Sequence, residues 1–365
     1  MTPSQDAAFM ARALKLAQNG LYTTDPNPHV GCVLVKHGEI IAEGWTQRAG
    51  YAHAEVDALS RAGDARGATA YVTLEPCSHQ GKTGPCTEAL IAAGVTRVVA
   101  AMQDPNPLVS GRGLQQLAAA GVEAVCGVLQ SEAENLNRGF FKRMSQGLPW
   151  IRSKLAMSLD GRTAMAGGES QWITSPLSRQ DVQRWRAASS AVLTGIDTVL
   201  ADDPSLSARV DFDVVQPVKV VLDSHLRMPL AARMLQDSAE VWIVTSSSDS
   251  VKRQRLLDAG YKVFQVDATA GRTDLHQVCR LLAERQINTV WIEAGATLNG
   301  ALLNSGLVDE WLIYMAPCVL GDSGRGLFRM PELQRLQDKK KLTLAEVRQV
   351  GPDLRLLYRP QTISD

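Results

Sequence analysis

The first half of the chain alternates between segments with helical spacing and short apolar runs. Apolar residues recur every three to four positions between Ser4 and Gln18, which predicts a helix that stops before Gly20. Two strands over 30–35 and 39–43 are expected to form a hairpin across the turn between them. The same patterns predict helices over 53–61, 87–93, 114–120 and 131–146, and strands over 68–74, 95–102 and 122–128. Strands that alternate with helices predict an α/β sheet covered by helices.

The second half begins with the same alternation and ends differently. Strands are predicted over 150–157, 191–194, 218–222, 241–245, 263–266 and 289–293, and helices over 175–188, 250–259 and 273–285. The last apolar stretches, 307–316, 342–350 and 354–359, have little helix between them, so they predict an antiparallel finish to an α/β domain. Gly147-Leu148-Pro149 interrupts the pattern between the halves. We therefore expect two domains, 1–147 and 148–365.

Composition narrows the class of protein. With 365 residues, 45% hydrophobic and 21% charged, the chain is expected to form two globular domains. Its 38 basic and 38 acidic residues cancel, which argues against a general nucleic-acid or membrane surface. We expect no signal peptide and no membrane span, because no apolar run is long enough.

Six cysteines in a chain of this length do not suggest a disulfide scaffold, so a reducing cytoplasm is the expected location. Four of them fall in or beside apolar strand or helix patterns, where buried free thiols are expected: Cys32, Cys126, Cys279 and Cys318.

The other two cysteines belong to the stretch that carries the candidate chemistry. It contains His53-Ala54-Glu55, then Pro76-Cys77, then Cys86. Histidine nitrogen and cysteine sulfur are the usual zinc ligands, and one histidine with two cysteines leaves a fourth tetrahedral position for water. We therefore predict a catalytic zinc ion held by His53, Cys77 and Cys86.

Glu55 lies two residues from the predicted ligand His53, so it can approach that water without binding the metal. A carboxylate there can take a proton from the water and pass it to a leaving amine, which makes Glu55 the predicted catalytic residue. Zinc-dependent nucleobase deaminases share the pattern H-x-E…P-C-x-x-C, whereas eight residues separate the cysteines here. The alternative is a structural zinc site closed by His79, which leaves Glu55 without a role.

Motifs in both halves resemble the bifunctional riboflavin-biosynthesis deaminase/reductase family. They are Thr73-Leu74-Glu75-Pro76-Cys77-Ser78-His79, Gly84-Pro85-Cys86, Pro26-Asn27-Pro28-His29-Val30-Gly31-Cys32, Asp104-Pro105-Asn106-Pro107, Lys154-Leu155-Ala156-Met157-Ser158-Leu159-Asp160-Gly161-Arg162 and Glu293-Ala294-Gly295. The resemblance thus covers essentially the whole chain. It implies a cytidine-deaminase-like three-layer domain followed by a dihydrofolate-reductase-like domain that binds NADPH.

In the second half, the most informative piece is a predicted strand that runs through a glycine turn into a helix, over 291–301. Backbone N–H groups at such a helix start can hold a phosphate. The dinucleotide fingerprint G-x-G-x-x-G is absent, so the pattern alone fits a plain strand-to-helix turn equally well. The resemblance favours the phosphate.

The resemblance also assigns residues by matching motif. NADPH contacts fall on Ala156, Trp172, Thr198, Asp202, Ser224, Gly295, Ala296, Thr297, Leu298, Asn299, Gly300 and Ala301. Substrate contacts fall on Ser170, Arg186, Leu206, Arg209 and Glu293, and the loop with Asn27 borders the pyrimidine site. Lys154 and Asp202 are polar groups near the implied site whose chemistry suits proton delivery. Guanidinium groups suit a substrate phosphate, although Arg186 alone also fits a solvated helix residue and Trp172 a core residue. His29 and His37 are expected in loops or at the surface.

The leading hypothesis is a bifunctional zinc hydrolase and NADPH-dependent oxidoreductase of riboflavin biosynthesis. It would deaminate a diaminopyrimidinone that carries a phosphoribosylamino group and then reduce the ribosyl side chain. The expected partner is this small molecule, with no nucleic acid or membrane, and a homodimer or higher homo-oligomer is plausible. One alternative is a tRNA or free-nucleobase deaminase with an accessory domain, and another is a non-catalytic zinc-stabilised binding module.

Overall fold

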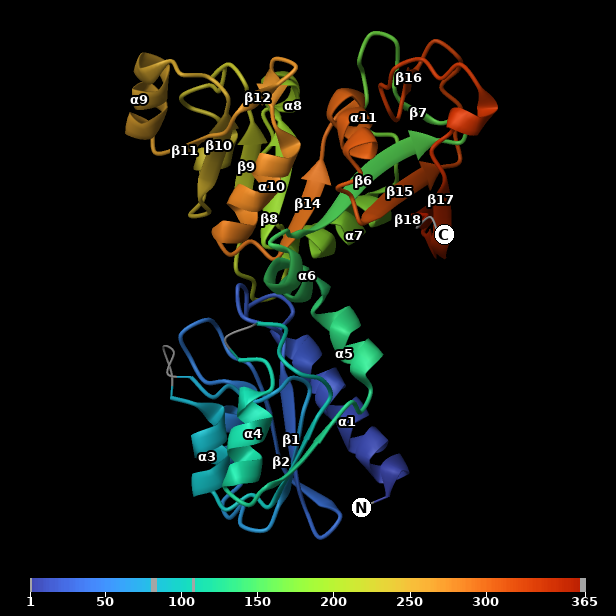
Figure 1. Cartoon of the computed structure of the whole chain (residues 1–365). Coiled ribbons are helices and arrows are strands. Elements are labelled where there is room, and N and C mark those ends of the chain that lie inside the picture. The colour runs from blue at the N-terminus through green and yellow to red at the C-terminus, as the bar shows by residue number, and fades with distance from the viewer. Residues whose placement is uncertain (1, 80–83, 107–108, 362–365) are drawn as a thin grey trace. The chain divides into compact units, whose positions relative to one another are not determined.

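The computed structural model describes residues 2–79, 84–106 and 109–361, and the chain divides into two compact units (Figure 1). The first unit comprises residues 1–147 with 213–215, and the second comprises 148–212 with 216–365. Among the described residues, no helix is both long and apolar enough to cross a membrane.

The first unit is built on a five-stranded sheet in the order β2-β1-β3-β4-β5. The strands are β1 Gly31–Lys36, β2 Glu39–Trp45, β3 Thr69–Val72, β4 Arg97–Ala100 and β5 Glu123–Cys126. The helices are α1 Pro3–Ala17, α2 Ala54–Leu59, α3 Cys86–Ala92, α4 Arg112–Ala119, α5 Gln130–Leu136 and α6 Arg138–Gln146, with a 3-10 turn η1 at Gln18–Gly20. The first two strands form the predicted hairpin, and β3, β4 and β5 run parallel.

Two glycines on neighbouring strands show how the helices cover both faces of this sheet. A Cβ on Gly31 would lie 1.9 Å from the Ala13 carbonyl oxygen of α1, and one on Gly44 would lie 2.5 Å from the Ala54 carbonyl oxygen of α2. Gly44 pairs with Cys32, the residue after Gly31, so the two glycines face opposite sides of the sheet. The predicted three-layer arrangement is therefore confirmed, with helix backbones in direct contact with the strands.

The helix predicted over 131–146 is interrupted, and that prediction was wrong. Asn137 leaves the helical region at φ −114° and ψ 26°, which separates α5 from α6. Its side chain accepts a hydrogen bond from the His29 backbone N–H at 2.7 Å and donates one to the His29 carbonyl at 2.9 Å. Asparagine often bonds backbone groups in this way, and here a segment distant in sequence supplies them.

The second unit is built on a nine-stranded sheet in the order β11-β10-β9-β8-β14-β6-β15-β18-β17. Its strands are β6 Trp150–Ser158, β8 Ala191–Gly195, β9 Val218–Leu222, β10 Val241–Thr245, β11 Lys262–Gln265, β14 Thr289–Glu293, β15 Glu310–Ala316, β17 Leu342–Val350 and β18 Asp353–Pro360. In this order, the strands from β11 to β15 are parallel, whereas β15, β18 and β17 pair antiparallel. The prediction of antiparallel strands at the end of the second domain is therefore confirmed.

Helices α7 Pro176–Ala187, α9 Ser250–Asp258 and α10 Leu275–Glu284 match the predicted ones, and α11 Ala296–Ser305 follows the glycine turn. The sequence patterns missed α8 Ile196–Asp202, which spans less than two turns. They also missed the short pairs β7 Arg162–Ala164 with β16 Arg325–Gly326 and β12 Ala268–Thr269 with β13 Arg272–Thr273, and the 3-10 turns η2 Arg233–Leu235 and η3 Leu336–Asp338.

The cysteine predictions were right in part. All six cysteines are free, and Cys32 and Cys279 are buried in the two cores. Cys318 is half-buried, and Cys126 is exposed, contrary to expectation. Cys126 ends β5, which is the edge strand of its sheet, so its apolar neighbours in sequence do not enclose it.

Replacing Asn137 by Ala should remove both hydrogen bonds to His29 and lower the free energy of unfolding of the first unit by about 1–3 kcal/mol. The matched control is Asn135→Ala, because Asn135 is exposed and its side chain accepts hydrogen bonds from the neighbouring Arg138 side chain. Hydrogen exchange of the β1 amides in increasing urea measures the difference. Equal protection in both variants would contradict a role of Asn137 in joining the segments.

Candidate active sites

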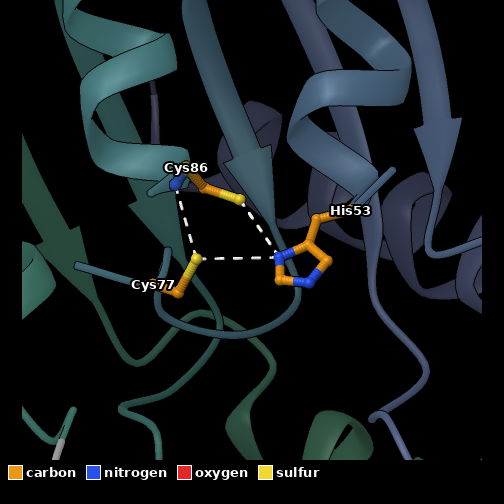
Figure 2. A group of neighbouring side chains, drawn as sticks. All are labelled: His53, Cys77 and Cys86. Atoms are coloured by element: carbon orange, nitrogen blue, oxygen red, sulfur yellow. Dashed lines mark hydrogen bonds between the residues drawn. The ribbon is translucent and has the colours of Figure 1, made fainter. Parts of the chain in front are cut away.

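Three side chains from separate elements meet in the first unit (Figure 2). The His53 Nδ1 atom lies 3.6 Å from the Cys77 sulfur and 3.3 Å from the Cys86 sulfur. Zinc bonds of about 2.3 Å to sulfur and 2.0 Å to nitrogen place these atoms about 3.5 Å apart in a tetrahedral site. The donor set and its spacing therefore fit one zinc ion. His79, the alternative fourth ligand, does not belong to this group of possible ligands.

Local structure explains how each ligand is held. His53 precedes α2 in an extended conformation, and Cys86 is the first residue of α3. Cys77 lies in the loop after β3, where its sulfur accepts the Cys86 backbone N–H at 3.4 Å. The ligands thus lie at two helix starts and one strand end, where backbone N–H groups and helix dipoles favour thiolates.

Protonation of the two thiols differs. Hydrogen bonds from Cys86 and His53 lower the pKa of Cys77 to about 4 despite its burial. The hydrogen bond to Cys77, together with burial, raises the pKa of Cys86. Zinc binds thiolates, so its binding must displace any proton on the two sulfurs.

Glu55 lies in the first turn of α2 and is buried. Burial raises its pKa to about 7, with a further contribution from the negative charge of Cys77. A carboxyl group that titrates near neutral pH beside the metal ligands is suited to accept and return a proton.

The loop that carries Asn27 lies next to this unit's core. The Asn27 N–H donates to the Thr24 carbonyl at 2.9 Å, and its side chain is half-buried. His29 lies in a loop, as expected, and is half-buried: its Nδ1 lies 2.6 Å from the Thr24 hydroxyl oxygen, and burial lowers its pKa to about 4. His37 occupies the hairpin turn at φ 55°, as expected. Pro107 of the second Asp-Pro-Asn-Pro motif lies outside the described residues.

The second unit contains a cavity of about 1650 Å³ at the carboxyl ends of its parallel strands. Most of the predicted contacts line it: Lys154, Ala156, Ser170, Trp172, Thr198, Asp202, Ser224, Glu293, Gly295, Ala296, Thr297, Leu298, Asn299 and Ala301. Ligands in open α/β sheets bind at this edge. Trp172 is 68% exposed, so the core alternative for it was wrong.

Two helix starts on adjacent strands open into the cavity. Gly195 precedes α8 and Gly295 precedes α11, and neither helix has a side-chain cap. Their first N–H groups can therefore bind phosphate oxygens, which fits the diphosphate of a dinucleotide. Ser224 and Asn299 also stabilise the local structure. Ser224 Oγ accepts the Thr273 N–H. The Asn299 side chain accepts a hydrogen bond from Ser153 Oγ and donates one to the Ala294 carbonyl.

Glu293 is the charged centre of the cavity wall. It pairs in register with Lys154 on the adjacent strand β6. Burial alone would raise the pKa of Glu293, but the positive charges of Arg186 and Lys154 lower it to about 2. Burial in turn lowers the pKa of Lys154 from its ordinary value.

Four predicted contacts of the second unit are not among the residues that line this cavity. Arg186 is buried and donates to both Glu293 oxygens and, at 3.0 Å, to the Ser207 carbonyl, so each of its guanidinium nitrogens has a partner and the solvated alternative was also wrong. Leu206 is buried in an apolar cluster, and Arg209 is exposed. Gly300 serves packing, because a Cβ there would lie 2.0 Å from the Arg329 carbonyl oxygen.

The sequence patterns missed several basic side chains that line the same cavity: Arg179, His225, Arg227, Arg272, His276, Arg325 and Arg329. They come from loops, short strands and helix starts scattered over the second half, so no local motif marks them. An anionic ligand is favoured in a cavity with this lining.

Comparison with known proteins agrees with both sites. Residues 3–102 match the model of the cytidine and deoxycytidylate deaminase zinc-binding region, and residues 149–356 match that of the RibD C-terminal domain. Riboflavin biosynthesis protein RibD of Escherichia coli (strain K12) is 52% identical, over 96% of this chain and 98% of that protein. RibD of Haemophilus influenzae is 50% identical, over 99% of each.

Solved structures give the same result. A structure of Acinetobacter baumannii RibD (form 1) has 47% identity and a TM-score of 0.92, over 99% of this chain and 100% of that one. A Thermotoga maritima protein described as a diaminohydroxyphosphoribosylaminopyrimidine deaminase/5-amino-6-(5-phosphoribosylamino)uracil reductase has 34% identity and a TM-score of 0.86, over 98% and 99%. The chain therefore belongs to the RibD family of bifunctional riboflavin-biosynthesis enzymes, with a zinc-dependent deaminase half and an NADPH-dependent reductase half.

Proposed function

We propose that the chain catalyses two successive steps of riboflavin biosynthesis. The first is deamination of 2,5-diamino-6-(5-phosphoribosylamino)pyrimidin-4(3H)-one. The second is NADPH-dependent reduction of the ribosyl side chain to give 5-amino-6-(5-phosphoribitylamino)uracil. The observation that carries the proposal is the cluster of His53, Cys77 and Cys86 with a buried Glu55 in one unit. The full-length relatives support the second step, so no accessory domain or binding module is needed to explain the second half.

We assign the deaminase to residues 1–147 and the reductase to 148–365. His53, Cys77 and Cys86 would hold the zinc ion, which when bound polarises the hydrolytic water. The Glu55 carboxylate takes a proton from this water as the water oxygen bonds to the amine-bearing ring carbon. Glu55 then delivers the proton to the amine nitrogen, the C–N bond breaks, and ammonia leaves a ring carbonyl behind. Because Glu55 is buried and its pKa is about 7, both of its protonation states are accessible near neutral pH.

In the reductase, the N–H groups at the starts of α8 and α11 would hold the cofactor diphosphate, and NADPH when bound supplies a hydride. Glu293 stays ionised and orients the Lys154 ammonium. Lys154 delivers a proton to the ribose oxygen that is released as the ring opens. Burial lowers the Lys154 pKa, which makes this proton easier to donate.

We also propose a cytoplasmic homodimer. All six cysteines are free, which suits a reducing compartment. Strand β17 lies at the edge of its sheet, and its Leu344 and Val347 side chains are 49% and 54% exposed. An edge strand with exposed apolar residues is a ready surface for pairing with a second copy.

Glu55→Gln should retain one zinc ion per chain while ammonia release falls by about 100- to 10,000-fold. The amide keeps the shape of the side chain but cannot carry the proton. Reduction of the deaminated intermediate by the same preparation should be unchanged. The control is Glu88→Gln, an exposed residue of α3. Ammonia release at the normal rate in Glu55→Gln would rule out the role assigned to Glu55.

Arg186→Gln should destabilise the reductase by up to about 3 kcal/mol, because the half-buried Glu293 loses its main cationic partner. Burial then raises the Glu293 pKa above its unfolded value, so the loss of stability should grow from pH 5 to pH 8. Thermal unfolding at the two pH values measures this, with Arg184→Gln on the exposed side of α7 as control. Adding Glu293→Gln should recover part of the loss. A deficit that shrinks with rising pH would contradict the ion-pair account.

Val347→Lys should convert a dimer to monomers, because it places a charge on the proposed contact strand. Light scattering after size-exclusion chromatography measures the mass. Val251→Lys is the matched control, since Val251 is similarly exposed on α9 of the same unit. A dimer that persists in Val347→Lys would place the contact on another surface. A monomeric wild-type protein would contradict the proposed dimer.

A further inference from the structure

Glu75 lies two residues before Cys77, yet its side chain does not face the metal cluster. Its carboxylate is buried and accepts four backbone N–H groups. The donors are Gly111 at 2.9 Å and Asp104 at 3.1 Å to one oxygen, and Gly113 at 2.8 Å and Leu114 at 3.2 Å to the other. An ionised carboxylate has four lone-pair sites that accept hydrogen bonds, and the four N–H groups occupy all of them. Only the ionised form can accept from all four donors, which are called the backbone cradle below.

The four donors come from two segments far from Glu75 in sequence. Asp104 lies in the loop after β4, and Gly111 to Leu114 form the start of α4. The Glu75 backbone also bonds to the segment after β4, since its N–H donates to the Met102 carbonyl at 2.9 Å. The carboxylate therefore ties the strand end that precedes Cys77 to a neighbouring loop and a helix.

Steric contact and a second set of hydrogen bonds act at the same place. A Cβ on Gly113 would lie 2.1 Å from the Pro76 carbonyl oxygen, so α4 packs directly on the peptide before Cys77. The Cys77 carbonyl accepts the Thr87 N–H at 3.2 Å, and the Thr87 hydroxyl donates toward Gln116 of α4 at 2.9 Å. The loop carrying Cys77 is thus held directly by α4 at Pro76, and at Cys77 by Thr87 of α3, which is itself bonded to α4.

We propose that Glu75 is a positioning residue of the deaminase, whose carboxylate fixes the Cys77 sulfur in the tetrahedral arrangement with His53 and Cys86. Cys77 has no helix or strand of its own to hold it, whereas His53 and Cys86 each adjoin a helix. The backbone cradle replaces that support. The proposal rests on the proposed function, in which Cys77 is a zinc ligand.

The test uses the full-length protein with Glu75→Gln and Glu75→Asp. The glutamine oxygen can accept from at most one side of the cradle, while its NH₂ group faces N–H donors. Zinc affinity, measured by competition with a chromogenic chelator, should weaken by about 10- to 100-fold in Glu75→Gln. The absorption bands of the Co²⁺-substituted protein, which report tetrahedral thiolate coordination, should shift. Glu75→Asp keeps the charge and should lie between the wild-type protein and Glu75→Gln.

Glu43→Gln is the matched control, because Glu43 in the same unit also accepts one hydrogen bond on each oxygen, both from Arg12, at a surface ion pair. Reductase activity should be normal in every variant. Wild-type zinc affinity and an unshifted cobalt spectrum in Glu75→Gln would overturn the proposal, as would an effect no larger than that of Glu43→Gln. If Glu75→Gln fails to fold, normal zinc affinity in Glu75→Asp with an unshifted spectrum would overturn it. Failure of the wild-type protein to bind zinc would instead remove the proposed function.

Discussion

The cost of burying a carboxylate determines how both sites are built. A buried charge is several kcal/mol unfavourable unless hydrogen bonds or opposite charges compensate for it. Glu75, just after β3, is compensated by four backbone N–H groups. Glu293, at the end of β14, is compensated by Arg186, the Trp291 indole N–H and the neighbouring Lys154. The partners of each carboxylate must therefore lie within bonding distance of it, and this requirement fixes the positions of the loops that contain them.

The two carboxylates are stabilised in different ways because the sites do different work. The backbone cradle of Glu75 is rigid and neutral, which suits support for a metal ligand whose geometry must not vary. The cations around Glu293 leave a charged surface in a cavity that must accept an anionic cofactor and substrate. A third carboxyl group, Glu55, has compensating interactions too weak to offset its burial, which raises its pKa to about 7. That difference separates a proton carrier from two structural anions.

Much of the site could be predicted from local sequence. His53, Glu55, Cys77 and Cys86 carry their chemistry in residue type and spacing, and their meeting in space follows from a strand end and two helix starts. Glu293 lies at the end of a predicted strand, so its place on a cavity wall also follows. Lys154 lies within a predicted strand and reaches the same wall because it pairs in register with Glu293. By contrast, nothing beside Arg186 in sequence indicates that Glu293, more than a hundred residues later, occupies its guanidinium. Leu206 and Gly300 likewise sit in motifs, but the packing around them assigns them to the core and to a close backbone contact.

The sequence by itself determined the alternation of strands and helices, the hairpin and the antiparallel strands near the end of the chain. It also predicted the three side chains that meet in the structure as a possible metal site, because periodicity and ligand spacing act over a few residues. Only the tertiary structure decided that Asn137 splits a helix by bonding His29, that Cys126 is exposed on an edge strand, and that Glu75 supports Cys77 rather than the metal. These features depend on which distant backbone groups are left in need of a partner. That requirement arises only when the chain folds and removes those groups from water.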